Sequence, residues 1–404
     1  MLALAFSIRS LLFSIPGYKI DIGDFAAWFQ TAAQNGIRPF YSTTTFHDYP
    51  PFSIYLFWFL GSLASSLSLF GTPRLVYLIK LPSNIFDLAT AFLIFSFVRR
   101  RSSFKSSFAA SALYAFNPAA VFDGAIWGQW DGIYTFFMIL SLISALDSRP
   151  KLSAATYSVA LLTKPQSVAL LPLIVFFIAK KYGWKSLLAS TLTAAATILI
   201  VILPFEWSNP VTFLLDIYAG AANYSGYRYT SMNAFNIWAL GGFWKSDAEL
   251  LLFFDLFTMG WILFGASTGF ALYVLHKRFK ASGELMVLFS AFVLSLSFFM
   301  LPTRIHERYI FPVLSVSALM LPFAKETRPI YIILSLTGLV NQAYVLSFLN
   351  AGQFILGWDP VVFSVSSINL LTFLYVLTLM WRELKGRSWL SVSQPFIGGG
   401  EPVS

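Results

Sequence analysis

Long apolar segments, separated by short polar or basic ones, run along most of the chain. They are roughly 15 to 27 residues long, and a helix that crosses a bilayer needs about 20 apolar residues. The pattern therefore predicts an all-α, polytopic bundle of transmembrane helices. Ten of the predicted spans fall in pairs, at about 107–122 and 131–146, 152–163 and 165–180, 185–204 and 249–275, 281–301 and 308–323, and 329–348 and 361–380.

Basic residues gather in clusters between these pairs. If all the clusters face the cytoplasm, as the positive-inside rule favours, an even number of crossings must separate each cluster from the next. With a first anchor helix in 1–18 and a second span at 75–98, the sequence predicts about twelve spans (range 11–13) and two cytoplasmic termini. The clusters lie at 99–105, 147–151, 180–185, 276–280, 325–328 and 382–387.

Two large loops are predicted on the opposite, extracytoplasmic face, at 17–74 and 205–248, and both are rich in aromatic residues. Segment 51–69 is long enough to span, but a crossing there would move 17–50 to the wrong face. We therefore expect 51–69 to be a juxtamembrane or re-entrant helix. The tail 391–404 is expected to be flexible.

Composition supports a membrane protein. Hydrophobic residues make up 57% of the chain and charged residues 11%, against about a quarter charged in soluble domains. The net charge of +9 comes from the clusters between spans, so positive-inside orientation explains it without a nucleic-acid partner. Because the chain has no cysteine, it can supply no disulfide, thiolate nucleophile or cysteine-ligated metal.

The first loop carries paired carboxylates. Asp21 and Asp24 are one helical turn apart, so both can project from one face near the start of a helix. The pair indicates either a general base beside the membrane or a helix cap. Further along, proline after Tyr49 favours an extended backbone that would fix His47 and Asp48 in place.

Three more polar groups are predicted on the same face, each with a structural alternative. The turn at 117–131 offers acids, an amide and tryptophan, which suit sugar binding, or it is a plain interfacial turn. Lys164 lies in apolar surroundings beside a proline. It either binds an anion there or extends its ammonium group to the membrane–water interface. The cluster at 304–309 is either a phosphate clamp or a self-neutralising network. The candidates in these groups and in the second loop are Asp123, Trp127, Gln129, Asp131, Lys164, Arg228, His306, Glu307 and Arg308.

Five motifs in order resemble the GT-C superfamily of membrane glycosyltransferases. Within it, they are similar to bacterial and archaeal relatives of GPI mannosyltransferase II and, more distantly, to dolichyl-phosphate-glucose glucosyltransferases. The motifs are Asp21 with Trp28, DYPP at 48–51, NPAAVFDGAIWGQWD at 117–131, TKPQ at 163–166 and HERY at 306–309. The resemblance implies a GT-C module over 1–275, followed by variable transmembrane helices over 276–390.

The resemblance also implies roles. Asp21 would be the general base, with Asp24 as a second base or as part of a metal site with Asp21 and Asp48. Lys164, His306 and Arg308 would hold the donor phosphate. Sugar and acceptor would meet His47, Asp48, Tyr49, Asp123, Trp127, Gln129, Asp131, Arg228 and Glu307.

The function expected on this basis is an inverting transfer of a hexose, mannose by resemblance, from a polyprenyl-phosphate sugar to a glycan or lipid acceptor. No cofactor is expected, and a divalent metal is not favoured. The expected location is the plasma membrane of a prokaryote, with the site extracytoplasmic and membrane lipids around the spans. Two alternatives stay open, a lipid-linked sugar transporter or flippase and a non-catalytic subunit of a glycan assembly complex.

Overall fold

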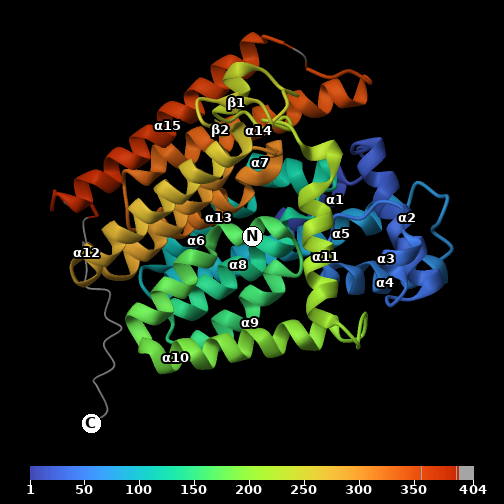
Figure 1. Ribbon diagram of the computed structural model, residues 1–404, viewed down its shortest axis with the longest axis horizontal. Helices are drawn as coiled ribbons and strands as arrows, with labels where there is room; N and C mark the ends of the chain where they lie inside the picture. The colour runs from blue at the N-terminus through green and yellow to red at the C-terminus, as the bar shows by residue number, and fades with distance from the viewer. Residues whose placement is uncertain (356, 388, 391–404) are drawn as a thin grey trace.

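The computed structural model describes residues 1–355, 357–387 and 389–390, and the predicted flexible tail at 391–404 lies outside them. The regular secondary structure of these residues is helical apart from a short antiparallel hairpin of β1 (Leu250–Leu251) and β2 (Phe254–Asp255). The predicted all-α membrane protein is therefore confirmed (Figure 1).

The helices of the described residues, in chain order, are α1 (Leu2–Leu12), α2 (Lys19–Asn35), α3 (Phe40–Thr43), α4 (Pro51–Ser66), α5 (Leu75–Arg99), α6 (Phe104–Ala115), α7 (Pro118–Val121), the π-helix η1 (Phe122–Trp127), α8 (Asp131–Leu146), α9 (Pro150–Leu161), η2 (Pro165–Leu170), α10 (Leu171–Ile202), α11 (Pro210–Asn223), η3 (Ser225–Tyr227), η4 (Trp238–Gly241), α12 (Leu256–Met300), η5 (Glu307–Ile310), α13 (Phe311–Met320), α14 (Thr327–Asn350) and α15 (Pro360–Leu384).

Among the described residues, five helical stretches are long and apolar enough to cross a membrane, so the expected twelve spans are wrong. The prediction treated several apolar segments as spans, but their helices α6, α9 and α13 have only 12, 12 and 10 residues. Such helices are too short for a bilayer of ordinary thickness. The five stretches are Leu75–Arg99, Pro165–Ile202, Leu256–Met300, Thr327–Asn350 and Pro360–Leu384.

Two of the long helices are broken at a glycine. Gly183 in α10 and Gly283 in α12 have positive φ values of 78° and 51°, which glycine adopts without steric cost. In α12 the hydroxyls of Ser267 and Ser297 are 2.7 Å apart, so its two arms lie side by side. From Leu285 to Met300 the second arm is buried, whereas the most apolar window of 165–202 is only 11% buried and offers its side chains to lipid.

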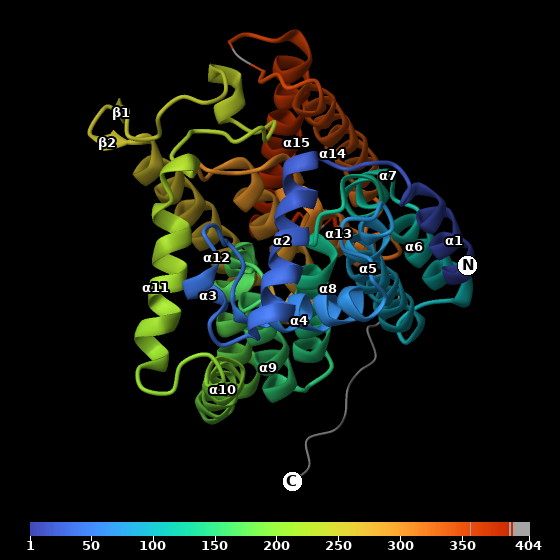
Figure 2. The same cartoon turned by 90° about the vertical axis from the view of Figure 1, so that its right-hand side faces the viewer.

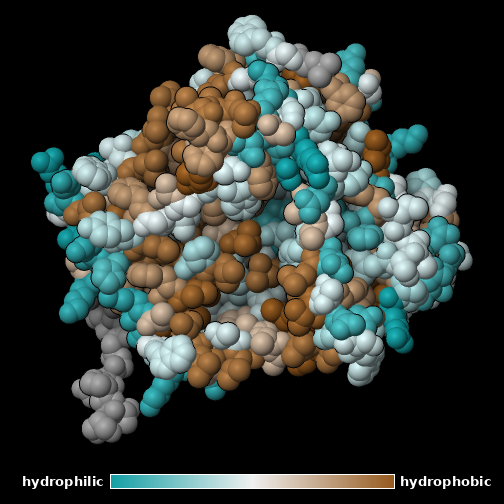
Figure 3. Space-filling model, in the orientation of Figure 1, coloured by the Kyte–Doolittle hydropathy of each residue, from teal (hydrophilic) through white to brown (hydrophobic). Residues whose placement is uncertain are grey.

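Three of the basic clusters, at 99–105, 147–151 and 180–185, meet at one end of the bundle. Asp147 pairs with Arg100 and Arg101, and Glu284 pairs with Arg101 and Lys181. These pairs join clusters that are far apart in the sequence, as the common-side argument requires. Hydrophilic side chains also gather near the bend of α12 and over α2 to α4, while apolar ones cover much of the face between (Figure 3).

The first large loop is a folded unit rather than an open loop. It contains α2, α3 and α4, which stand beside α11 at one side of the bundle (Figure 2). At 16 residues, α4 is not among the five candidate spans, in line with the expected juxtamembrane helix. It starts with Pro51 in its first turn after an extended Pro50, as the proline pair predicts.

Close contact between α2 and α4 depends on Gly61. A Cβ atom built there would lie 2.1 Å from the backbone oxygen of Phe29, so Gly61→Ala must push the helices apart. We expect a loss of stability of about 1–3 kcal/mol, measured as a lower thermal unfolding midpoint in detergent. Gly23→Ala is the matched control, since no atom lies within 4 Å of its Cβ position. Equal midpoints for both variants would contradict this packing.

Candidate functional site

A cavity of about 430 Å³ lies where the first loop, the 117–131 turn and the 304–309 cluster meet. Three elements supply most of its polar wall: the first turns of α2, the turn after η1, and the segment leading into η5. Ten of the predicted site residues line it, namely Asp21, Asp24, Asp48, Tyr49, Trp127, Gln129, Lys164, His306, Glu307 and Arg308.

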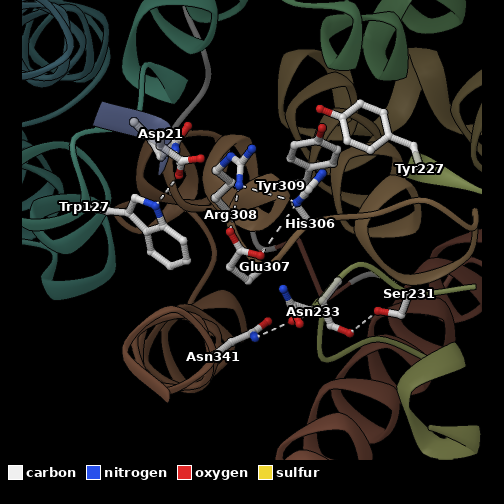
Figure 4. Close-up of polar contacts among 12 residues, drawn as sticks. Asp21, Trp127, Tyr227, Ser231, Asn233, His306, Glu307, Arg308, Tyr309 and Asn341 are labelled. Atoms are coloured by element: carbon white, nitrogen blue, oxygen red, sulfur yellow. Dashed lines mark hydrogen bonds and ion pairs between the residues drawn. The ribbon is translucent and has the colours of Figure 1, made fainter. Parts of the chain in front are cut away.

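Asp21 joins the first motif to the 117–131 motif. Its Oδ2 accepts a hydrogen bond of 2.8 Å from Trp127 Nε1 (Figure 4) and one of 2.6 Å from Gln129 Nε2. Gln129 follows Gly128, whose φ of 92° lets the π-helix end in a sharp turn toward the cavity. The carboxylate is therefore held by two neutral donors from another part of the chain, and α2 has no side-chain cap.

The cations at the site already have carboxylate partners. Lys164 Nζ lies 2.9 Å from Asp131 Oδ2, and Arg308 Nη1 lies 2.8 Å from Glu307 Oε1. Arg308 Nε is also 3.7 Å from Asp131 Oδ2, so Asp131 serves both cations. Lys164 reaches this position because its extended backbone, before Pro165, separates α9 from η2.

The imidazole of His306 is packed against aromatic rings. Its ring centre lies 5.3 Å from that of Tyr309 and 5.6 Å from that of Tyr227. Burial, with the charges of Arg308 and Lys164 nearby, holds the pKa of His306 well below its usual value. His306 is therefore neutral at physiological pH and adds no positive charge.

Asp48 is held on one side only. Its Oδ2 accepts a hydrogen bond of 3.0 Å from the hydroxyl of Tyr227, whereas its Oδ1 is buried and has no partner among the described side chains and backbone. Burial raises the pKa of Asp48, and Lys164, Tyr227 and Arg308 oppose that rise. Burial likewise raises the pKa of Glu307, against the opposing charge of Arg308.

Four predicted site residues do not line the cavity. His47 packs against the ring of Tyr41, and Arg228 donates to the backbone oxygen of Asn223. Asp131 lies behind the wall, paired with Lys164. Asp123 is fully buried in η1, and its carboxylate oxygens have no partner among the described residues.

The site also contains residues that the sequence did not single out. Tyr227 and Asn233 come from the second large loop, and β-bridges tie Met232 and Asn233 to His306. The amide of Asn341, in α14, donates to the backbone oxygen of Asn233 at 2.8 Å. The aromatic residues of 205–248 were the one sequence feature that indicated a role for the second large loop in the cavity. Gln166, whose amide donates to Tyr309, was visible in the TKPQ motif.

The three aspartates of the first loop form no metal site. Among the residues that the structure describes, no group of three or more His, Asp or Glu side chains is arranged to hold a metal ion. The shared site suggested for Asp21, Asp24 and Asp48 is thus without geometric support. The carboxyl groups must be considered as acceptors or charges.

Asp24 gives the site a pH dependence near neutrality. Burial, and repulsion from Asp21 and Asp48, raise its pKa from 3.8 to about 6. The folded state therefore binds this proton more tightly than the unfolded state, and the resulting stabilisation is lost as pH rises through about 6. We expect wild type to lose stability relative to Asp24→Asn between pH 5 and 7, in thermal unfolding. Parallel pH profiles for the two proteins would contradict this assignment.

The comparison with known proteins points away from the glycosyltransferases. Residues 26–226, just under half of the chain, match the family described as PIG-U: GPI transamidase subunit PIG-U. No curated protein matches the chain. The match includes DYPP, the 117–131 motif and TKPQ, but Asp21 and HERY, on which the catalytic interpretation depended, lie outside it.

The match overturns the expected function. The GT-C glycosyltransferase resemblance, the enzyme class, the transfer of a hexose and the polyprenyl-phosphate sugar as partner are all wrong by this finding. The physical reason is that an acidic, aromatic pocket beside a membrane suits binding as well as transfer, so residue types alone do not separate the two. The roles expected of single residues, Asp21 among them, stay predictions. By sequence, residues 26–226 of this chain are similar to PIG-U, a subunit of the GPI transamidase.

Proposed function

We propose that the chain is a non-catalytic subunit of a membrane complex of the GPI transamidase type, the assembly that attaches GPI anchors to proteins. The single observation that carries the proposal is the PIG-U match over 26–226. It agrees with the alternative of an assembly-complex subunit and not with an enzyme acting alone. Its partners would be the other subunits of that complex, with GPI and the proprotein as the substrates of the whole.

The cavity supports a binding role within such a complex. The matched segment supplies much of its wall, including Asp48, Trp127 and Lys164. Aromatic faces and amide groups suit the glycan part of a GPI molecule. Transamidation exchanges one amide for another, and a thiolate nucleophile for that step must come from another subunit because this chain has no cysteine.

Purification of the tagged chain from its own membrane tests the proposal. In mild detergent we expect a stable complex that cleaves a proprotein's C-terminal signal and transfers the new C-terminus to hydroxylamine, a small amine nucleophile. The same preparation after dissociation into subunits should have no such activity. A chain that purifies alone, with no transamidase activity in any fraction that contains it, would contradict the proposal.

The orientation proposed with this function puts the cavity on the face opposite the basic clusters. Single cysteines can test it, since the chain has none. We expect an impermeant maleimide applied from the cavity side to label Ser42→Cys and Ser225→Cys but not Ser102→Cys. Labelling of Ser102→Cys alone would reverse the orientation. The prokaryotic plasma membrane expected from the sequence stays a prediction.

A further inference from the structure

Acidic groups outnumber cations at the cavity. Four carboxyl groups line it, from Asp21, Asp24, Asp48 and Glu307, and Asp131 lies directly behind. Against these five, the described residues that line the cavity supply only two permanent cations, Lys164 and Arg308, because His306 is neutral. An anionic ligand would therefore enter a site that already has negative charge in excess.

The cations are also the groups least free to meet a ligand. Lys164 is paired with Asp131 and Arg308 with Glu307, both at less than 3 Å. The carboxylates of the first loop form no ion pair with any residue that the structure describes: the hydrogen bonds that Asp21 and Asp48 accept come from neutral donors. The unpartnered, buried Oδ1 of Asp48 is an acceptor that a ligand's N–H could satisfy.

The aromatic walls fit the same kind of ligand. Trp28, Tyr224 and Trp244 line the cavity together with Tyr18 and Tyr227. Faces of such rings attract cations and stack on sugars. Carboxylates without cationic partners, set among aromatic rings, therefore suit an ammonium group.

We infer that the cavity binds a protonated primary amine carried on a sugar or lipid headgroup, with Asp24 and Asp48 as its carboxylate partners. The inference rests on the proposed function, because it names the chemistry by which this subunit would recognise its glycolipid. Selectivity would come from charge. A protonated amine neutralises part of the cavity's excess negative charge, whereas an uncharged nitrogen on the same sugar does not.

A matched pair of ligands tests the inference on the unmodified protein. The probes are glucosaminyl phosphatidylinositol and its N-acetyl derivative in nanodiscs, with free glucosamine and N-acetylglucosamine as the soluble arms. Binding is measured by calorimetry or by the fluorescence of the cavity tryptophans. We expect acetylation to weaken binding by about tenfold or more, since a hydrogen bond between charged groups is replaced by a neutral one. Binding of only the lipid pair would identify a headgroup as ligand, and binding of both pairs would identify the amino sugar itself.

Variants locate the amine. Asp24→Asn and Asp48→Asn should each reduce the preference for the free amine severalfold or more, whereas Asp216→Asn, on the exposed surface of α11, should leave it unchanged. Equal affinity for amine and N-acetyl ligands in the wild type would overturn the inference while leaving the complex proposal standing. A clear amine preference in a chain that never enters a transamidase complex would support the inference and contradict the complex proposal.

Discussion

Arg9→Met should destabilise the protein by about 3–5 kcal/mol, because it leaves a buried carboxylate without its partner. The guanidinium of Arg9 and the carboxylate of Asp87 are 2.7 Å apart, and both side chains are fully buried. Arg9 also donates to Asn84 Oδ1 and to the backbone oxygen of Ala115, so it joins α1 to α5 and α6. The measurement is the midpoint of thermal unfolding in detergent, followed by size-exclusion chromatography.

The double variant Arg9→Met/Asp87→Leu is the control for this result. Replacing both charges with apolar groups of similar size removes the unpaired carboxylate, so much of the lost stability should return. A single variant as stable as wild type would show that the pair contributes nothing. A double variant no better than the single one would show that Asn84 and Ala115, rather than Asp87, are the partners that matter.

Asp131→Asn should have an effect of similar size, about 3–5 kcal/mol, and should also alter the cavity. The change removes the carboxylate that lies 2.9 Å from Lys164 and 3.7 Å from Arg308, while Asp131 itself is fully buried. Two cations are then left with reduced compensation. We expect a lower unfolding midpoint and a loss of the preference for amine ligands, because the excess of acids shrinks.

Asp147 offers a matched control at the other end of the bundle. Like Asp131 it serves two cations, Arg100 and Arg101, at 2.5 and 2.9 Å, but its side chain is 25% exposed. Asp147→Asn should therefore cost no more than about 1 kcal/mol, as for pairs reached by solvent. If the two substitutions destabilise equally, burial is not what makes the Asp131 pairs important.

The class of the fold and most of the cavity could be predicted from the sequence. The motifs carrying Asp21, Asp48, Lys164 and His306 were each weak alone, yet they meet around one cavity. They were predictable because ionisable residues in an apolar chain are costly unless they share a polar pocket. Among the wall residues missed, Tyr227 and Asn233 come from a loop with no local pattern that fixes its position.

The number of spans could not be predicted in the same way. Hydropathy registers an apolar segment whether lipid or protein surrounds it, and α13 is apolar because it is buried among other helices. The structural role of Arg9 could not be predicted either, since nothing near it in the sequence indicates that its partner is Asp87, 78 residues away. The function could not be predicted from the residue types, because a binding pocket and a transferase pocket use the same side chains.

Depletion of the chain from its own cells tests the central claim most directly, with the GPI-type glycolipids that accumulate as the readout. A transamidase subunit acts after the glycan is complete, so the account predicts accumulation of full-length glycolipid together with uncleaved proprotein. Re-expression of the wild-type chain should clear both. Accumulation of a glycolipid shortened by one sugar would contradict the account, because it would show that this chain builds the glycan and does not take part in its transfer to protein.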